Sequence, residues 1–334
     1  MSLLDRQRVK LLTLQQVVAP ELERFETQFA SLMAGGPALV QDICGHIQQG
    51  RSKRFRPTLL LLAAKHQGPV DERAVIAAAC LELIHTATLV HDDFIDGAIT
   101  RRGLPSVNRA WGEAAALIMG DYLYARALDA LCRHGLDDTV RKLAHTTLLM
   151  SEAEMLQLES KFSLKLDEDL YLRIIEYKTA ALIEAACEIG ASFNAQNDGH
   201  RDSFGRFGRK VGLVFQITDD IFDYLGDERR LGKPTGQDWE EGRVTLPLIA
   251  ALRQADPAAR EAFLGEARDR RDNGWREMWP RVKGFVAEHG GVDYAFAVAR
   301  RYGEEAKSEL TPVASGTQKE LLAAAAEYVI NRLN

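Results

Sequence analysis

Apolar side chains recur at three- and four-residue spacing along almost the whole chain, which is the pattern of amphipathic α-helices. The pattern predicts helices at residues 3–33, 38–48, 58–66, 71–96, 106–132, 137–162, 167–197, 200–225, 246–252, 257–270, 274–289, 292–309 and 317–333. Alternating runs bounded by hairpin turns, which would indicate β-strands, are few. We therefore expect an all-α protein.

Two polar loops stand between these helices. Residues 97–105 form a basic loop, and residues 226–243 form a loop rich in glycine and charge. Each loop follows a predicted helix that ends in acidic residues. No low-complexity linker and no internal repeat divides the chain, so we expect residues 1–334 to form one domain.

The composition narrows the class of protein without changing this fold prediction. With 46% hydrophobic and 27% charged residues, the chain is typical of soluble globular proteins. Its net charge of −6 argues against general nucleic-acid binding, which needs a basic field. No run reaches the roughly 18 apolar residues of a membrane-spanning helix, and the first ten residues lack the apolar stretch of a signal peptide. We therefore expect a cytoplasmic protein without a transmembrane segment.

The four cysteines also fit that location. Cys44, Cys80, Cys132 and Cys187 lie far apart and show no C-x-x-C spacing. We expect all four to be buried free thiols in a reducing compartment.

Acidic residues gather at two predicted helix ends. Asp92, Asp93 and Asp96 stand at the first, and Asp219, Asp220 and Asp223 repeat the D-D-x-x-D spacing at the second. Like charges four residues apart share a helical face and disfavour the helix, and carboxylates at a C-terminal end also oppose the helix dipole. A bound cation would resolve this conflict. Mg²⁺ is suitable because it bridges carboxylates to substrate phosphates.

Basic residues follow both acidic patches, and a further basic cluster lies earlier in the chain. Arg101 and Arg102 follow the first patch, Lys233 and Arg243 follow the second, and the early cluster is Lys53, Arg54 and Arg56. Arginine binds phosphate oxygens in pairs, and lysine adds a point charge. Together with Mg²⁺, these residues predict a pocket for a polyanionic phosphate. A P-loop is not indicated, because the chain has no G-x-x-x-x-G-K-[ST] sequence.

With these acidic and basic motifs, the sequence resembles the trans-isoprenyl diphosphate synthases, also called polyprenyl synthetases. The first aspartate motif reads LVHDDFIDGAITRRG at 89–103, and the second reads FQITDDIFDYLGDERRLGKPTGQDWEEGRVTLP at 215–247. Shorter similarities are K-R-x-R-P at 53–57, Glu-Leu-Ile-His at 82–85, Gly-Asp-Tyr-Leu at 120–123, and Lys178-Thr179. These motifs occur in the family's order between residue 50 and about residue 250.

The resemblance implies a single all-helical domain, a bundle around a deep central cavity with both aspartate motifs at its mouth. It implies that Asp92, Asp96 and Asp219 are the principal Mg²⁺ ligands, supported by Asp93, Asp220 and Asp223. It places Arg101, Lys178, Thr179, Gln216 and Lys233 around the allylic diphosphate and its reactive carbon. It assigns Lys53, Arg56, His85 and Arg102 to the isopentenyl diphosphate site.

The sequence departs from the family pattern at two places. Arg51-Ser52 stands where the family usually has Gly-Gly, and this changes the backbone that approaches diphosphate. Gly242-Arg243 stands where Gly-Lys is common. Because the charge is kept, we expect Arg243 to contact phosphate with altered geometry.

The implied reaction is the head-to-tail condensation of isopentenyl diphosphate with an allylic diphosphate. Three Mg²⁺ ions would draw charge from the allylic diphosphate until its C–O bond ionises. Thr179, backbone carbonyls near Lys178 and the amide of Gln216 would stabilise the allylic cation. The isopentenyl double bond would then attack, and its proton would pass to the departing diphosphate.

Small residues below the first motif bear on product length. The position of Ala87, five residues before Asp92, is aromatic in family members that make short products. Here Ala87 and Thr88 are both small, so the tail is expected to pass them and grow beyond C20. The alternative products are geranylgeranyl and farnesyl diphosphate.

Three other functions would use part of this pattern. A class I terpene cyclase shares the metal chemistry but needs no second substrate site such as Lys53, Arg56 and His85. A non-catalytic subunit of a heteromeric prenyl synthase would be expected to lose motif aspartates, and this chain keeps them all. A metal-stabilised helical scaffold is the remaining alternative. We expect a homodimer, with the apolar 106–132 helix as the interface candidate.

Overall fold

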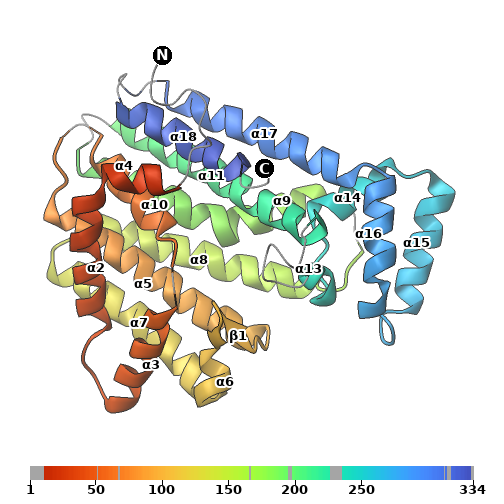
Figure 1. The fold of residues 1–334 in the computed structure, drawn as a ribbon, viewed down its shortest axis with the longest axis horizontal. Coiled ribbons are helices and arrows are strands. Elements are labelled where there is room, and N and C mark those ends of the chain that lie inside the picture. The colour runs from red at the N-terminus through yellow and green to blue at the C-terminus, as the bar shows by residue number, and fades with distance from the viewer. Residues whose placement is uncertain are drawn as a thin grey trace. The chain divides into compact units, whose positions relative to one another are not determined.

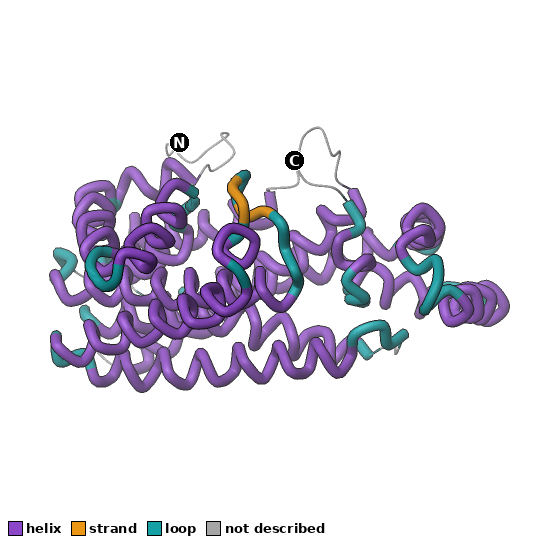
Figure 2. Tube along the Cα trace, turned by 90° about the horizontal axis from the view of Figure 1, so that it is seen from below, coloured by secondary structure: helices purple, strands orange, loops and turns teal. Residues whose placement is uncertain are grey.

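The computed structural model describes residues 11–50, 52–66, 68–164, 167–194, 198–225, 235–311, 313 and 317–331. These residues are helical apart from two short strands and the turns between elements (Figures 1 and 2), as the sequence predicts. The chain divides into two compact units. Unit 1 comprises Met1–His145, Leu182–Gly205 and Pro312–Leu322, and unit 2 comprises Thr146–Ala181, Arg206–Thr311 and Ala323–Asn334. The prediction of one domain stays a prediction.

The elements of unit 1 come mainly from the first half of the chain. They are α1 (Leu11–Val17), α2 (Ala19–Met33), α3 (Ala38–Gln49), α4 (Phe55–Ala64), α5 (Glu72–Ile95), β1 (Thr100–Arg101), β2 (Leu104–Pro105), α6 (Val107–Trp111) and α7 (Glu113–Arg133). Four helices have residues in both units: α8 (Asp137–Ser160), α10 (Ala181–Ser192), α11 (Asp198–Leu225) and α18 (Thr317–Asn331).

The remaining elements belong to unit 2. They are α9 (Glu168–Ile175), a π-helical turn (Glu176–Ala180), α13 (Gln237–Glu240), α14 (Leu246–Gln254), α15 (Pro257–Asp269), a 3₁₀ turn (Arg276–Met278), α16 (Trp279–Glu288) and α17 (Gly291–Glu309). Most predicted helices are therefore confirmed to within a few residues, although residues 3–10 lie outside the described part of the chain.

Helix α5 forms the core of unit 1. It packs against α2, α4 and α7, and its residues from Ala74 to Ile84 are all buried. A helix that is apolar all round must be covered on all sides. By length and composition alone α5 could cross a membrane, contrary to the expectation from sequence, but 72% of its most apolar window is buried inside the protein. Core helices of soluble proteins have the same property.

The predicted basic loop folds into a β-hairpin, which the sequence analysis missed. Strand β1 pairs with β2 in antiparallel register, with Arg101 opposite Leu104. The two-residue turn is Arg102-Gly103, with φ values of 52° and 80°. Positive φ at both turn residues matches the twist of the flanking strands. The hairpin thus fixes Arg101 and Arg102 directly after the first aspartate motif.

Several predicted helices are interrupted, and residues 11–33 form α1 and α2 with Val18 between them. Residues 106–132 form α6 and α7 instead of one helix, because Gly112 between them has a φ of 89° that side chains avoid. Residues 167–197 contain the π-helical turn at Glu176–Ala180. Such turns are frequent at functional sites, and this one carries Lys178 and Thr179.

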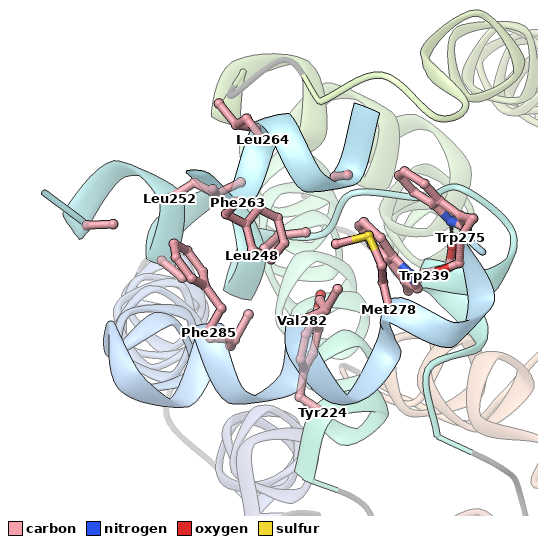
Figure 3. Packing of buried hydrophobic residues seen from close by; sticks show 14 residues of the cluster. Tyr224, Trp239, Leu248, Leu252, Phe263, Leu264, Trp275, Met278, Val282 and Phe285 are labelled. Carbon is pink, nitrogen blue, oxygen red and sulfur yellow. Dashed lines mark hydrogen bonds between the residues drawn. The ribbon is translucent and has the colours of Figure 1, made fainter. Parts of the chain in front are cut away.

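The core of unit 2 is built on aromatic residues from the C-terminal third of the chain (Figure 3). Trp239 and Trp275 stack with their ring centroids 3.8 Å apart. Each indole N–H donates to the other residue's carbonyl, at 2.8 Å and 2.6 Å. Two buried indoles therefore satisfy each other's polar groups. This packing ties α13, in the segment that follows the second aspartate motif, to the turn that precedes the 3₁₀ turn and α16.

All four cysteines are free thiols, as predicted. Cys44, Cys80 and Cys187 are buried, but Cys132 is exposed near the end of α7. The expectation that all four are buried is therefore wrong for Cys132.

Candidate active site

The first aspartate motif lies at the C-terminal end of α5. Asp92 and Asp96 are half-buried, and the backbone N–H of Asp96 donates to the Asp92 carbonyl at 2.8 Å, so the helical geometry continues through the motif. One turn apart, these two carboxylates share a face. Asp93 is rotated away from that face and is only 3% exposed. The three aspartates of this motif therefore have two different environments.

Asp93 forms an ion pair with Arg101, which lies on the β-hairpin. Arg101 Nε lies 2.8 Å from Oδ1 and 3.0 Å from Oδ2 of Asp93, and Arg101 Nη2 also contacts Oδ1. Burial lowers the pKa of Arg101, but the hydrogen bonds and charge of Asp93 outweigh it, so the net shift is upward. Asp93 thus anchors the hairpin to α5, a role that the metal assignment from sequence did not include.

The glycine of the Gly-Asp-Tyr-Leu motif has a packing role next to this end of α5. A Cβ on Gly120 would lie 2.1 Å from the ring of His91. His91 Nε2 lies 3.0 Å from the carbonyl oxygen of Leu117. Gly120 therefore lets α7 approach the residue that precedes Asp92.

A group of cations surrounds His85. Arg56 Nη1 lies 2.9 Å from His85 Nε2. Because a guanidinium only donates, Nε2 must accept and the ring carries its proton on Nδ1. Burial, then the charges of Arg56 and Arg102, hold the pKa of His85 well below its ordinary value of 6.5. The imidazole is neutral in a strongly electropositive setting, which suits an anionic ligand.

This arrangement predicts a pH dependence of stability. The unfolded chain protonates His85 as the pH falls through 6.5, whereas the folded protein does not. The contribution of His85 to stability should therefore be constant above pH 6.5 and fall below it, by up to about 1.4 kcal/mol per pH unit. His85→Gln keeps an acceptor for Arg56 without a titrating ring. In urea unfolding from pH 5 to 7.5, the free energy of unfolding of the wild type should fall relative to that of His85→Gln as the pH falls, and parallel curves would contradict the assignment.

The other predicted residues of this group differ in their partners. Arg102 packs its stem near Gly50, and burial lowers its pKa. Lys53 is exposed. Arg54 is committed elsewhere, since it pairs with Glu26 and Glu82 and lies over the ring of Phe29 at 4.4 Å. Arg54 is therefore a structural residue. Arg56, Arg101 and Arg102 lie close enough to His85 for their charges to lower its pKa. Lys53 belongs to the same unit.

The second aspartate motif lies in the last two turns of α11. Asp219 is half-buried, whereas Asp220 is 3% exposed. Asp220 accepts hydrogen bonds from the hydroxyl of Tyr171 at 2.6 Å and from Gln216 Nε2 at 2.8 Å. Burial and the charge of Asp238 raise the pKa of Asp220 despite these two donors. Its carboxylate is directed into the protein, as that of Asp93 is in the first motif.

Asp223 binds the backbone of the following segment. Its Oδ1 accepts from the N–H groups of Gly236 and Gln237 at 2.9 Å and 3.2 Å, and its Oδ2 accepts from Asp238 N–H at 3.1 Å. Burial and the charge of Asp238 raise the pKa of Asp223 to about 6. Asp223 therefore holds the start of α13 against α11.

The π-helical turn presents the two predicted residues Lys178 and Thr179. Thr179 is buried, and its hydroxyl donates to Gln216 Oε1 at 2.8 Å. Lys178 forms an ion pair with Glu154 of α8 and a long contact of 3.4 Å to Gln157. Thr179 and Gln216 are thus brought together as predicted. Tyr171 and Glu154 were missed, because their partners lie far away in sequence.

The remaining two basic residues are less well placed for phosphate. Arg243 pairs with Asp238 at 3.0 Å and with Glu241 at 2.5 Å, both in its own segment. Phosphate binding by Arg243 would have to replace these partners and stays a prediction. Lys233 lies outside the described residues, as does Arg51.

The donor set fits Mg²⁺ bound together with phosphate. Within the described residues, no group of three or more His, Cys, Asp and Glu side chains could hold a metal ion by itself. Mg²⁺ does not need such a group, since it keeps several waters and binds through one or two carboxylates plus substrate phosphates. Asp92 with Asp96, and separately Asp219, would provide those carboxylates, whereas Asp93, Asp220 and Asp223 bind protein groups.

Comparison with known proteins gives the same family as the motifs. The polyprenyl synthetase family model matches residues 37–275. An all-trans-nonaprenyl-diphosphate synthase (geranyl-diphosphate specific) of Rhodobacter capsulatus is 35% identical over 329 residues, covering 96% of this chain and 98% of that protein. Heptaprenyl diphosphate synthase component 2 of Geobacillus stearothermophilus is 34% identical, covering 97% of this chain and 99% of that protein.

A solved structure confirms the fold class. The crystal structure of a polyprenyl synthase from Caulobacter crescentus, complexed with calcium and isoprenyl diphosphate, matches with a TM-score of 0.90. It is 30% identical, and the match covers 98% of this chain and 99% of that one. The all-α isoprenoid synthase fold predicted from the motifs is therefore correct.

Proposed function

Since the chain belongs to the polyprenyl synthetase family and is a trans-polyprenyl diphosphate synthase, we propose that it condenses isopentenyl diphosphate with an allylic diphosphate, in a Mg²⁺-dependent reaction, to products longer than C20. The observation that carries this proposal is the form of the two aspartate motifs. In each, the first aspartate (Asp92 or Asp219) is half-buried at a helix end, while the second (Asp93 or Asp220) is anchored inside the protein.

We propose that each aspartate motif holds divalent metal bound with diphosphate, the first through Asp92 and Asp96 and the second through Asp219. Mg²⁺, as three ions, would supply positive charge to meet the negative charge that grows on the leaving diphosphate. Arg101 adds charge beside Asp92, and Lys178 can exchange Glu154 for a diphosphate oxygen. The calcium and isoprenyl diphosphate in the Caulobacter structure support divalent metal at such a site.

The cations around His85 are proposed to bind isopentenyl diphosphate. Arg56 and Arg102 offer planar guanidinium groups that fit phosphate oxygens, and exposed Lys53 adds a point charge. Neutral His85 orients Arg56 through Nε2, which accepts from the guanidinium. These residues would place the substrate double bond, and the chemistry itself needs no protein base among them.

The π-helical turn and α11 are proposed to act on the allylic cation. When the C–O bond breaks, the oxygen of Thr179, the amide of Gln216 and nearby carbonyls can face the positive carbon as dipoles. The π turn shifts the backbone hydrogen bonds, with Ala181 N–H donating to the Glu176 carbonyl five residues earlier. The new C–C bond forms as the isopentenyl proton passes to the departing diphosphate.

Product length beyond C20 rests on the residues below the first motif and on the relatives. Ala87 is buried and Thr88 is half-buried, and neither side chain is large. The relatives above are named for nonaprenyl and heptaprenyl products. The name of the Rhodobacter protein also makes geranyl diphosphate the first primer to test.

A product analysis tests this proposal. The purified protein would receive Mg²⁺, labelled isopentenyl diphosphate and dimethylallyl, geranyl or farnesyl diphosphate, and the dephosphorylated products would be sized. We expect a ladder that ends beyond the C20 alcohol. A stop at C20 or C15 would contradict the long-chain product and retain the reaction, and no extension from any primer would contradict the reaction.

A second copy of this chain is the proposed protein partner. Helix α7, within the predicted interface 106–132, exposes Leu117 and Ile118 by 48% and 66%. Because the Geobacillus relative is named as component 2, a heteromeric assembly is the alternative. Sedimentation of the purified chain at its assay concentration distinguishes them: an active dimer supports the homodimer, and an inactive monomer contradicts it.

The cytoplasmic location stays a prediction.

A further inference from the structure

We propose that Tyr171 is a positioning residue for the condensation, which fixes the amide of Gln216 through the carboxylate of Asp220. The inference rests on the proposed function, because it deepens the account of the same site. It also gives Asp220 a role other than metal binding, although the sequence analysis included Asp220 among the metal residues.

Four buried or half-buried side chains of unit 2 form one continuous chain of hydrogen bonds. The Tyr171 hydroxyl donates to Asp220 Oδ2 at 2.6 Å, and Gln216 Nε2 donates to Asp220 Oδ1 at 2.8 Å. The Thr179 hydroxyl donates to Gln216 Oε1 at 2.8 Å. Both oxygens of Asp220 are therefore occupied by protein donors.

This chain fixes which way the Gln216 amide points. Because Asp220 Oδ1 accepts from the amide nitrogen of Gln216, the amide oxygen is left to face the hydroxyl of Thr179. Tyr171 supports the arrangement because it satisfies the second oxygen of a carboxylate that is only 3% exposed. Without the Tyr171 hydroxyl, the Asp220 side chain must find another donor or rotate. Either change disturbs its hydrogen bond with Gln216.

The π-helical turn explains how one segment reaches α11 twice. In a regular α-helix, residues 171 and 179 would be roughly 80° apart around the axis. The turn at Glu176–Ala180 absorbs about one extra residue, which reduces that angle to roughly 20°. Tyr171 and Thr179 can then contact the same side of α11, at positions 220 and 216 one turn apart. The π-helical turn therefore allows Tyr171 and Thr179 to contact α11 together.

Removal of the Tyr171 hydroxyl tests the proposal. We expect Tyr171→Phe to lower kcat for condensation by tenfold to a hundredfold, with KM for isopentenyl diphosphate within twofold of the wild type. Tyr224→Phe is the matched control, since Tyr224 is also buried in unit 2 and its hydroxyl contacts Thr245 at 3.3 Å. Its kcat should stay within twofold of the wild type.

A double-mutant cycle separates positioning from a general loss of structure. If Tyr171 acts through Gln216, adding Tyr171→Phe to Gln216→Ala should lower kcat no further. Multiplying losses would overturn the proposal. So would an unchanged kcat in Tyr171→Phe, or an equal loss in Tyr224→Phe.

A second variant covers the case in which Tyr171→Phe does not fold. Asp220→Asn retains an acceptor for Tyr171 but offers N–H to Gln216, which would reverse the amide. It should lower kcat to a similar extent while the Mg²⁺ concentration for half-maximal rate stays within twofold. A large rise in that concentration would make Asp220 a metal ligand and overturn the assignment. Inactive wild-type protein would instead refute the proposed function, and this inference with it.

Discussion

Replacement of Asp92 by asparagine is expected to lower kcat for condensation about a thousandfold and leave the fold intact. Such a loss corresponds to roughly 4 kcal/mol of transition-state stabilisation. Asp92 is half-buried at the end of α5, and its charge would help to hold metal against the leaving diphosphate. Asparagine keeps the shape and removes that charge. Steady-state rates at saturating Mg²⁺ and substrates measure the effect.

The control for this variant is Asp138→Asn. Asp138 lies in the first turn of α8, and its side chain is 79% exposed. It should have wild-type activity. Near-normal activity in Asp92→Asn, with an unchanged melting temperature, would refute the metal assignment of the first motif.

Arg101→Leu is expected to reduce stability as well as activity. It would leave the Asp93 carboxylate, whose side chain is 4% exposed, buried without its cation. Breaking a fully buried pair costs about 3–5 kcal/mol. Because the Arg101 side chain is 40% exposed, solvent screens part of this, and we expect a loss of about 2–3 kcal/mol in the free energy of unfolding.

The double variant Arg101→Leu/Asp93→Asn should recover most of that stability, because no buried charge then remains. Arg133→Leu is the control, since its pair with Asp129 is exposed on α7 by 75% and 50%. It should change the free energy of unfolding by less than about 1 kcal/mol. Urea unfolding of the four proteins measures this. No recovery in the double variant would mean that Arg101 stabilises the protein through other contacts.

Helical periodicity was sufficient to predict most of the fold. It failed where single residues changed the backbone. Gly112 separates α6 from α7, and Arg102-Gly103 turns a loop into a hairpin. An isolated glycine is tolerated in many helices, so the sequence pattern did not distinguish a break from a continuous helix. The π turn at Glu176–Ala180 depends on packing, since a Cβ on Gly212 of α11 would lie 2.4 Å from the Cα of Ala180.

The sequence predicted which residues form the candidate site. It did not predict which of the aspartates bind protein groups. D-D-x-x-D alone presents three equivalent carboxylates, yet Asp93 and Asp220 are buried and bound by protein groups. Helical geometry carried a signal for this, because the middle aspartate lies about 100° from the face shared by the first and last. The sequence carried no signal for Tyr171, the partner of Asp220, or for Glu154, the partner of Lys178. Such pairs are far apart in sequence and are set by tertiary packing.

Thermal melting of the metal-free protein with Mg²⁺ alone, with inorganic diphosphate alone and with both tests whether the two aspartate motifs bind metal together with diphosphate. If the aspartates hold metal only together with diphosphate, each alone should change the melting temperature little. Both together, at about 100 times the apparent Kd, should stabilise the fold by about 2.7 kcal/mol. A full shift with Mg²⁺ alone would indicate a metal-stabilised scaffold. No shift with both would contradict a metal-diphosphate site.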